Sequence, residues 1–388
     1  MKEIKQIIQA YEEACINQQK VALATVVHVE GSSYRGPGAR MLIKEDGMLV
    51  GAISGGCLEG DALRKALMVM MQGKPLLTTY DTSDEDDAFI GVGLGCNGII
   101  RVLIEPILQD DEANPIMLLK AALQNRQSSI VVTFFSLHDK WREDQGTRLL
   151  LKEGGNQMQN SVTTIDFQRV AEEAKEIFEK RCSFFVQYTS SEKEPVDSPL
   201  TAFMEYIAPN MSLVVVGAGN DVFPLVQLAE VLGWRITLVD GRPNYASAQR
   251  FPNCQLVVSE PEKALKDISI DDKTAVILMT HNYHYDKNML KALSTYSIRY
   301  IGMLGPKKKL DKLLKELEEE GADLRQKLLN IYSPVGLNIG AETSEEIALS
   351  IIAEIKAVFA NKAGGYLRDL SGKIHDRKTE IVNAVINV

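Results

Sequence analysis

The sequence predicts an α/β protein in which an N-terminal mixed α+β domain is followed by a Rossmann-like domain with a parallel sheet. Its second half alternates short apolar runs with helix-length segments, as at residues 213–216, 236–239 and 274–279. Such alternation indicates parallel strands joined by right-handed crossovers, with helices on both faces of the sheet. At 388 residues, the chain also exceeds the roughly 250–300 residues at which a single core stops growing. Two domains are therefore expected.

The boundary between the domains is expected in a polar stretch that carries two prolines, residues 190–199. Polar stretches interrupted by proline are typical of linkers. We assign residues 1–190 to the N-terminal domain, residues 191–205 to a linker and residues 206–388 to the Rossmann-like domain.

The regular elements of the N-terminal domain follow from the spacing of its apolar residues. Helical spacing predicts helices over residues 2–18, 58–72, 115–124 and 166–179. Runs of strand-forming residues predict strands over residues 21–29, 41–43, 48–50, 75–80, 99–107, 129–137, 148–152 and 182–189. Asp46-Gly47 predicts a hairpin turn, and the acidic residues 81–87 predict a solvated loop.

Charge and composition exclude several classes of function. The formal net charge of −9 and the lack of a long basic stripe argue against nucleic-acid binding. No apolar run approaches the roughly 18 residues of a membrane span, and the amphipathic start does not resemble a signal peptide. The five cysteines are scattered without a CxxC pair, as in reduced cytosolic proteins. We expect a cytoplasmic protein that binds neither nucleic acid nor membranes.

Two glycine-rich stretches, residues 31–40 and 51–60, are the strongest functional signal in the first half. Glycine at this density marks backbone that turns tightly or lies close to another group. The first stretch carries Arg35 and Arg40, whose guanidinium groups suit an anionic ligand.

The second stretch places a cysteine directly before a predicted helix. The run Ser54–Cys57 leads into that helix, and Glu59 follows in its first turn. The helix dipole stabilises anionic groups at this position, including a thiolate. The alternative is that Cys57 is a buried packing residue and that the glycines only shape turns.

A second cysteine, Cys96, is embedded in the glycine-rich residues 91–98. Loops of this kind cluster at one side of a sheet. We expect Cys57 and Cys96 on one side of one cleft, facing Gly217–Gly219 across the domain boundary.

The Rossmann-like domain carries part of a nucleotide-binding pattern. Gly217-Ala-Gly219 follows a predicted strand, and Asp240 ends the next strand at the distance expected of a ribose-binding acid. Val222 replaces the third glycine of the pattern. The pattern indicates backbone N–H groups and a helix dipole directed at an anion, while a Rossmann-shaped domain without any nucleotide is the alternative.

Histidines after the strand over residues 274–279 are a further signal. His281, His284 and Asp286 lie at the carboxyl edge where α/β sheets bind ligands. Because no third or fourth metal ligand is evident nearby, we expect hydrogen-bonding roles and no metal site.

The chain resembles the XdhC/CoxI family, the accessory proteins of xanthine dehydrogenase and related molybdenum hydroxylases, over nearly its whole length. The N-terminal motifs are Gly31-Ser-Ser, Pro37-Gly-Ala-Arg40, Ser54-Gly-Gly-Cys-Leu-Glu59, Gly93-Leu-Gly-Cys-Asn-Gly98 and Glu105-Pro106. The C-terminal motifs are Val216-Gly-Ala-Gly219, Asp240-Gly-Arg-Pro243, Thr280-His281, Tyr300-Ile-Gly-Met-Leu-Gly305, Ser333-Pro-Val-Gly-Leu-Asn-Ile-Gly340 and Glu345-Glu-Ile-Ala348. The chain departs from the pattern in its nucleotide turn, which lacks an extra glycine, and at Asn338, where many relatives have aspartate.

The resemblance implies a homodimeric chaperone of purine catabolism that binds the molybdenum cofactor (molybdopterin), assists its sulfuration and delivers it to a xanthine dehydrogenase-type molybdenum hydroxylase. Cys57 or Cys96 would handle sulfur supplied by a cysteine desulfurase. The residues expected to bind the cofactor are Arg35, Arg40, Ser54, Gly55, Gly56, Glu59, Gly217, Gly219, Asp240, Arg242 and His281. The alternatives are an NAD(P)-dependent oxidoreductase and an interaction scaffold with a vestigial Rossmann shape.

Overall fold

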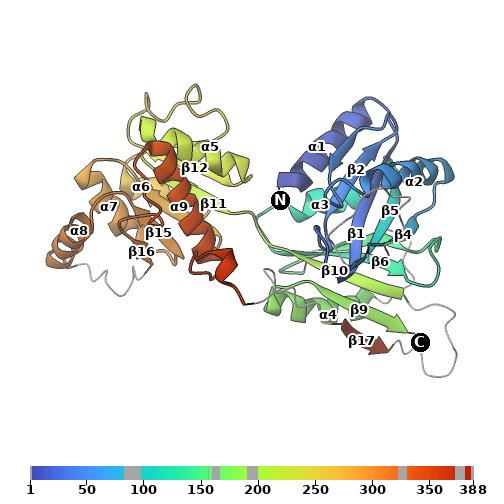
Figure 1. Cartoon of the computed structure of the whole chain (residues 1–388). Helices are drawn as coiled ribbons and strands as arrows, with labels where there is room; N and C mark the ends of the chain where they lie inside the picture. The colour runs from blue at the N-terminus through green and yellow to red at the C-terminus, as the bar shows by residue number, and fades with distance from the viewer. Residues whose placement is uncertain are drawn as a thin grey trace. The chain divides into compact units, whose positions relative to one another are not determined.

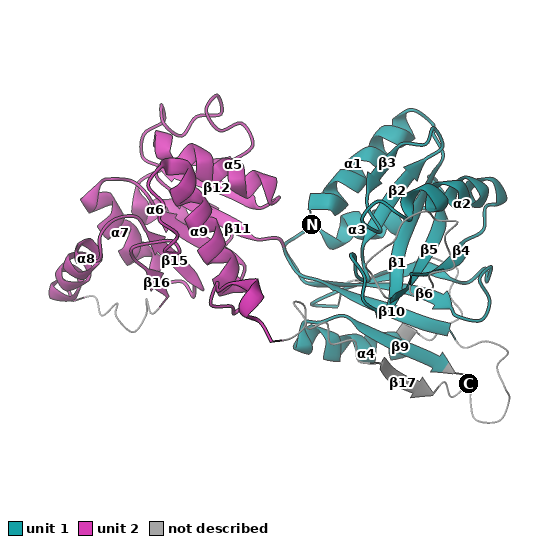
Figure 2. Cartoon of the chain, viewed as in Figure 1, with its two compact units in different colours: residues 1–209, 376–388 teal, residues 210–375 magenta. Residues whose placement is uncertain are grey.

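The protein divides into two compact units, which Figure 2 colours separately. Unit 1 comprises residues 1–209 and 376–388, and unit 2 comprises residues 210–375. The computed structural model describes residues 2–82, 98–155, 157–159, 167–189, 200–321, 330–371 and 381–385.

The boundary lies later in the chain than the predicted linker, residues 191–205. Leu200–Ile207 forms strand β10, which pairs along its whole length with β6 in unit 1. Six of its eight residues are buried, as its apolar composition requires. The prolines of residues 190–199 suggested a boundary that is too early in the chain, because the strand after them pairs with strands that are distant in the sequence. Residues 191–199 themselves lie outside the described part.

Unit 1 contains two sheets. The first has the order β3-β2-β1-β5-β4 and the second the order β17-β9-β10-β6-β7-β8. The strands of the first sheet are Val21–Gly31 (β1), Arg40–Lys44 (β2), Leu49–Gly51 (β3), Leu76–Asp81 (β4) and Gly98–Ile107 (β5). Those of the second are Ser129–Ser136 (β6), Gly146–Lys152 (β7), Gln157–Gln159 (β8), Phe184–Thr189 (β9), β10 and Ile381–Val385 (β17).

The two sheets pack face to face, and helices cover their outer faces (Figure 1). Val27 of β1, Leu103 of β5 and Phe203 of β10 share the apolar cluster between the sheets. Ala24 and Val26, which point to the other face of β1, pack with α2. The helices are Lys2–Ile16 (α1), Glu59–Gln72 (α2), Pro115–Ala122 (α3) and Phe167–Lys180 (α4), of which α4 covers the second sheet and α1 and α3 pack together against strands of both sheets.

Unit 2 is built on one parallel six-stranded sheet of order β13-β12-β11-β14-β15-β16. Its strands are Ser212–Val216 (β11), Arg235–Asp240 (β12), Gln255–Val258 (β13), Thr274–Leu278 (β14), Tyr300–Met303 (β15) and Ile331–Tyr332 (β16). The α-helices are Phe223–Val231 (α5), Pro261–Ala264 (α6), Tyr283–Leu293 (α7), Lys307–Glu319 (α8) and Ser344–Phe359 (α9). Short 3-10 helices lie at Asn220–Val222 (η2), Leu265–Asp267 (η3) and Leu367–Asp369 (η4).

The helices of unit 2 cover both faces of the sheet, which confirms the predicted Rossmann-like architecture. One apolar cluster joins the sheet to α5 and α9, and the other joins it to α6, α7 and α8 (Figure 1). The chain leaves β11 toward β12 on one side and reaches β14 on the other, so the strand order reverses between β11 and β14. In open α/β sheets, ligands bind at the carboxyl ends of the strands beside such a reversal.

Within the described residues, we find no helix that combines the length and the apolar character needed to cross a bilayer.

Candidate functional site

The glycine-rich stretches of unit 1 meet at one end of its first sheet. The last residue of β1, Gly31, pairs with the first residue of β5, Gly98. A Cβ at Gly98 would overlap the carbonyl oxygen of Ser32, so only glycine allows the backbones to lie this close. The chain entering β5 therefore lies directly beside the loop that follows β1. Cys96, which precedes Gly98, lies outside the described residues.

The second glycine loop lies at the same end. β3 is antiparallel to β2, and its last residue, Gly51, pairs with Met41 at the start of β2. The ring of Tyr34 lies against Gly55, with its Cδ1 atom 3.6 Å from the position of a Cβ at Gly55. We call residues 31–39, residues 52–58 and Gly98 the glycine-loop end of unit 1.

Ser54 and Glu59 hold the second loop closed on itself. The Glu59 carboxylate accepts hydrogen bonds from the Ser54 N–H (2.9 Å), the Ser54 hydroxyl (2.5 Å) and the Leu58 N–H (3.1 Å). The Ser54 Oγ atom accepts from the Gly56 N–H at 3.1 Å. Burial opposes ionisation of Glu59, but these hydrogen bonds outweigh it and lower its pKa below the ordinary value. The anion before α2 is thus the protein's own carboxylate, and Ser54 and Glu59 shape the loop.

The Cys57 thiol lies in this loop, half-buried, with its Sγ atom 3.4 Å from the Ser54 Oγ. Leu58 is the N-cap residue and α2 begins at Glu59, so the thiol precedes the helix as the sequence predicts. The Cys57 side chain is partly buried against the apolar cluster under α2. Gly56 beside it has open space where a Cβ would stand.

The two arginines of the first glycine stretch have different surroundings. Arg35 pairs with Glu3 of α1 at 2.5 Å, and about a third of its side chain (32%) is exposed. Arg40 is 1% exposed and forms a bidentate ion pair with Glu205 of β10, including Nη1 to Oε1 at 3.2 Å. This corrects the prediction that Arg40 binds the cofactor: its guanidinium is buried and joins the two sheets of unit 1.

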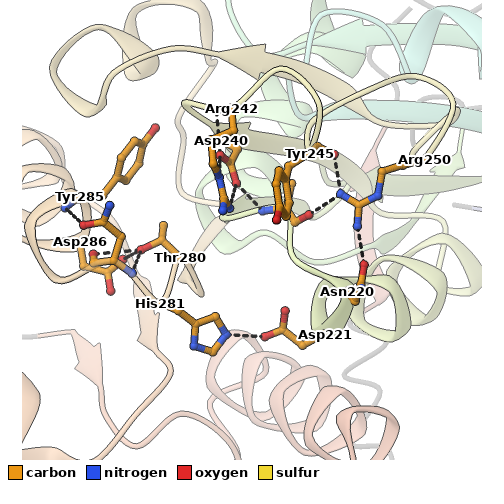
Figure 3. A network of polar contacts seen from close by, with 12 residues as sticks. Asn220, Asp221, Asp240, Arg242, Tyr245, Arg250, Thr280, His281, Tyr285 and Asp286 are labelled. Atoms are coloured by element: carbon orange, nitrogen blue, oxygen red, sulfur yellow. Dashed lines mark hydrogen bonds and ion pairs between the residues drawn. The ribbon is translucent and has the colours of Figure 1, made fainter.

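In unit 2, the predicted nucleotide turn lies beside the strand-order reversal. Gly217 has a φ of +112°, and a Cβ there would lie 2.5 Å from the Met279 carbonyl oxygen, so the residue must be glycine. A Cβ at Gly219 would overlap the Asp221 carboxylate. That carboxylate pairs with the exposed His281 side chain, Nε2 to Oδ2 at 3.0 Å (Figure 3).

Asp240 ends β12 with its carboxylate turned toward protein donors. It accepts from the Ala218 N–H and from the N–H, Nε and Nη2 of Arg242, each at 2.9 Å. Burial opposes ionisation, but the hydrogen bonds from Arg242 and Ala218 prevail and lower the pKa of Asp240. Asp240 and Arg242, both predicted to bind the cofactor, therefore lie together and form an ion pair with each other.

Aromatic and basic side chains surround this pair, as Figure 3 shows. The Arg242 guanidinium lies 3.8 Å from the centre of the Tyr245 ring. Arg250 donates to the carbonyl oxygens of Ala218 and Tyr245 at 2.7 and 2.8 Å. We call Asp240, Arg242, Tyr245 and Arg250 the arginine corner of unit 2.

On the other side of the turn lie a small pocket and a buried ion pair. The pocket, of about 220 Å³, is lined by Asp221, Leu225, Met279, His281, Leu304 and residues of α9. Asp286 is fully buried and accepts from the Thr280 hydroxyl at 2.6 Å and from Lys309 at 2.7 Å. Among the described residues, no group of three or more His, Cys, Asp or Glu side chains could hold a metal ion.

Several residues that contact the predicted site residues could not be identified from the sequence. Glu205, Asp221, Tyr245 and Arg250 belong to no motif, and only the fold brings them to Arg40, Gly219 and Asp240. Tyr34 carried a usable signal, since it is the one aromatic residue inside the first glycine stretch.

Comparison with known proteins gives the relatives of the chain. The XdhC and CoxI family matches residues 15–81, and the XdhC Rossmann domain matches residues 213–355. A Bacillus subtilis (strain 168) protein, named as a probable subunit of xanthine dehydrogenase, is 32% identical over 341 residues, which cover 87% of this chain and 93% of the relative. The molybdenum cofactor insertion chaperone PaoD of Escherichia coli (strain K12) is 24% identical over 352 residues, covering 91% of this chain and 87% of PaoD.

A solved structure extends the similarity to the fold. A Bacillus halodurans protein described as a xanthine dehydrogenase is 30% identical, covers 93% of this chain and 98% of its own, and gives a TM-score of 0.72. The family resemblance carried by the sequence motifs is confirmed in both halves of the chain. The chain belongs to the XdhC and CoxI family.

Proposed function

We propose that this protein is a maturation factor that binds the molybdenum cofactor at the glycine-loop end of unit 1 and delivers it to a xanthine dehydrogenase-type hydroxylase. The names of two relatives support this role: PaoD is called a molybdenum cofactor insertion chaperone, and the Bacillus subtilis relative is named for xanthine dehydrogenase. The observation that carries the proposal is the meeting of the glycine loops around Tyr34, Gly55 and Gly98.

The exposed groups at this end suit a planar anionic ligand. The Tyr34 side chain is 72% exposed, so one face of its ring can stack on a flat heterocycle such as a pterin. Arg35 is accessible and can exchange Glu3 for a phosphate, since an exposed ion pair contributes little stability. A Cβ at Gly56 would meet no atom within 4 Å, so the space beside Cys57 is open to a ligand. The bound cofactor would supply the molybdenum chemistry of the recipient hydroxylase.

Cys57 is the residue proposed to handle sulfur, with Cys96 as the alternative. Its thiolate would attack the outer sulfur of a persulfide on a cysteine desulfurase. The sulfur–sulfur bond of the donor breaks, a new one forms on Cys57, and the donor keeps a thiolate, so no oxidant or reductant is needed. Mass spectrometry after incubation with a desulfurase and cysteine would then find one added sulfur atom on Cys57.

We propose that the protein is cytoplasmic. Its scattered cysteines suggest reduced thiols, and thiols stay reduced in the cytoplasm. We also propose that it acts as a homodimer and serves purine catabolism, in line with the xanthine dehydrogenase named for its Bacillus subtilis relative.

The experiment is to measure pterin and molybdenum in full-length protein purified anaerobically from a cofactor-producing host. Wild-type protein should carry both, and Tyr34→Ala and Arg35→Ala should each lower the content several-fold. Arg64→Ala is the matched control, because Arg64 is a largely exposed arginine of the same unit that pairs with Asp61. Equal pterin content in all four proteins, or none in the wild type, would contradict the proposal.

A further inference from the structure

The arginine corner differs from an NAD site in the number of hydrogen bonds that Asp240 already accepts from the protein. A carboxylate offers about four lone-pair positions for hydrogen bonds. Asp240 uses both oxygens: Oδ1 accepts from the N–H and Nε of Arg242, and Oδ2 accepts from Ala218 and the Nη2 of Arg242. In NAD-binding Rossmann domains, the acid at this position accepts hydrogen bonds from the ribose hydroxyls. Asp240 has no position left for them while Arg242 is in place.

The turn after β11 also fits the diphosphate of NAD poorly. The carboxylate of Asp221 lies against Gly219, where the backbone would have to approach the diphosphate. Val222, at the place of the third glycine, is fully buried in the core under the turn. A diphosphate here would meet the negative charge of Asp221, whose ion-pair partner among the described residues is the exposed His281 side chain.

Arg242 supplies a donor where Asp240 no longer supplies an acceptor. Its side chain is 52% exposed, and its Nη1 atom donates no hydrogen bond to any described residue. The Tyr245 ring beneath the guanidinium and the Asp240 carboxylate beside it fix its plane. A guanidinium held in this way is a preorganised partner for a phosphate oxygen.

The surrounding charges limit the arginine corner itself to one phosphate group. Arg250 adds a second positive charge beside Tyr245. Asp240 neutralises Arg242 in part, and the Glu260 carboxylate lies near Gly241, 3.7 Å from the position of a Cβ there. Two guanidinium groups against two carboxylates leave no large excess of positive charge.

We propose that the arginine corner of unit 2 binds a phosphomonoester through Arg242, so that, of two dinucleotides with the same diphosphate, NADP⁺ binds more tightly than NAD⁺. The 2′-phosphate of NADP⁺ would lie where NAD⁺ presents a ribose hydroxyl to Asp240. This site lies on unit 2 and the glycine-loop end lies on unit 1, and the proposal stands whether or not unit 1 carries the molybdenum cofactor. The same chemistry would accept the phosphate of a pterin, and the experiment separates these two sources.

The test is isothermal titration calorimetry of the full chain with NADP⁺, NAD⁺, adenosine 2′-monophosphate and adenosine 5′-monophosphate. A charge-assisted hydrogen bond to phosphate predicts that NADP⁺ binds at least about tenfold more tightly than NAD⁺. The 2′-monophosphate should likewise bind more tightly than the 5′-monophosphate. Equal affinities within each pair, or no binding of either 2′-phosphate at millimolar concentration, would overturn the proposal.

Variants of Arg242 make the test specific. Arg242→Ala should weaken NADP⁺ binding about tenfold or more and leave NAD⁺ binding equal or improved, because it frees the Asp240 carboxylate for ribose hydroxyls. Arg242→Lys should keep part of the preference, since it keeps the charge. Arg235→Ala is the matched control: Arg235 lies at the opposite end of the same strand and bonds Gln255. Unchanged NADP⁺ affinity in a folded Arg242→Ala protein would also overturn the proposal.

A competition experiment identifies the source of the phosphate. If protein loaded with the molybdenum cofactor loses NADP⁺ binding, the pterin phosphate occupies the arginine corner. If loaded protein binds NADP⁺ unchanged, the corner belongs to a second, nucleotide ligand. Both results support a phosphomonoester site at Arg242, and a lack of molybdenum cofactor in the protein would bear only on the function proposed for unit 1.

Discussion

The ring of Tyr34 lies against Gly55, with Cδ1 3.6 Å from the position that a Cβ at Gly55 would take. This contact joins the loop after β1 to the loop after β3, and Gly98 joins the first of these loops to β5. A largely exposed aromatic ring is thereby held against the loop that carries Cys57. That arrangement is the basis of the function proposed for unit 1.

The two glycines should respond differently to alanine. Gly98→Ala should lower the free energy of unfolding by about 1–3 kcal/mol, because the new methyl group overlaps the backbone of Glu30 and Ser32. Gly55→Ala should change it by less than about 0.5 kcal/mol, since its methyl group would meet only the Tyr34 ring at ordinary contact distance. Denaturant unfolding followed by circular dichroism measures both. Equal effects of the two substitutions would show that the loops do not meet as described.

The two arginines of the first glycine stretch should contribute very differently to the stability of the folded protein. Arg40→Ala should cost about 3–5 kcal/mol of unfolding free energy, because it leaves the Glu205 carboxylate without its partner in a buried pair. Arg35→Ala should cost no more than about 1 kcal/mol, since its ion pair with Glu3 is partly exposed. Thermal unfolding of both variants, with Glu205→Gln as a second way to break the buried pair, is the measurement. A stable Arg40→Ala protein would remove Arg40 from the junction between the sheets.

The Ser54–Glu59 contact should make the second glycine loop sensitive to acid. The pKa of Glu59 is lower in the folded protein, so its stabilising effect is complete above the unfolded value of 4.5 and is lost as the pH falls through the folded value. Glu59→Gln should therefore cost about 1 kcal/mol at neutral pH and progressively less in acid. Unfolding free energies of wild type and variant from pH 7 to pH 3 would check this. A difference that stays constant with pH would argue against an ionised Glu59 in the loop.

His28 should give unit 1 a second pH dependence, at higher pH. Burial and the neighbouring Arg101 lower its pKa below 6.5, with Glu30 opposing, and its ring packs edge-on against Phe185 at 5.1 Å. The stabilisation is present above the unfolded pKa of 6.5 and is lost as the pH falls through the lower folded value. His28→Phe should flatten the loss of stability between neutral pH and pH 5. The same slope in both proteins would assign the dependence to other groups.

The sequence was sufficient for features that local patterns encode. Asp46-Gly47 forms the predicted hairpin between β2 and β3, with Gly47 at a φ of +89°. The short apolar runs of the second half form the predicted parallel sheet, because strands buried on both faces need uninterrupted apolar residues. The first two glycine-rich stretches meet at one end of the first sheet of unit 1, while the loop that carries Cys96 lies outside the described residues.

Features that depend on distant residues could not be predicted. Arg40 looked like a ligand-binding arginine because its partner, Glu205, lies 165 positions away on a strand that was assigned to the linker. Asp240 looked like a ribose-binding acid because its position on β12 is right, but hydrogen bonds to Arg242 and Ala218 use its oxygens. In both cases, the residue type suggested ligand binding, but a protein group that the local motif does not pair with it occupies the side chain instead.

The most direct test of the central claim is the alkylation rate of Cys57 in cofactor-loaded and cofactor-free protein, followed by mass spectrometry. Cys57 should be labelled faster than Cys15, Cys182 or Cys254; burial, together with Glu230, raises the pKa of the Cys254 thiol to about 11 and makes it the slow internal reference. If the molybdenum cofactor binds at the glycine-loop end, loaded protein should react several-fold more slowly at Cys57 and unchanged at Cys254. Equal rates at Cys57 with and without bound cofactor would contradict the account and place the cofactor elsewhere.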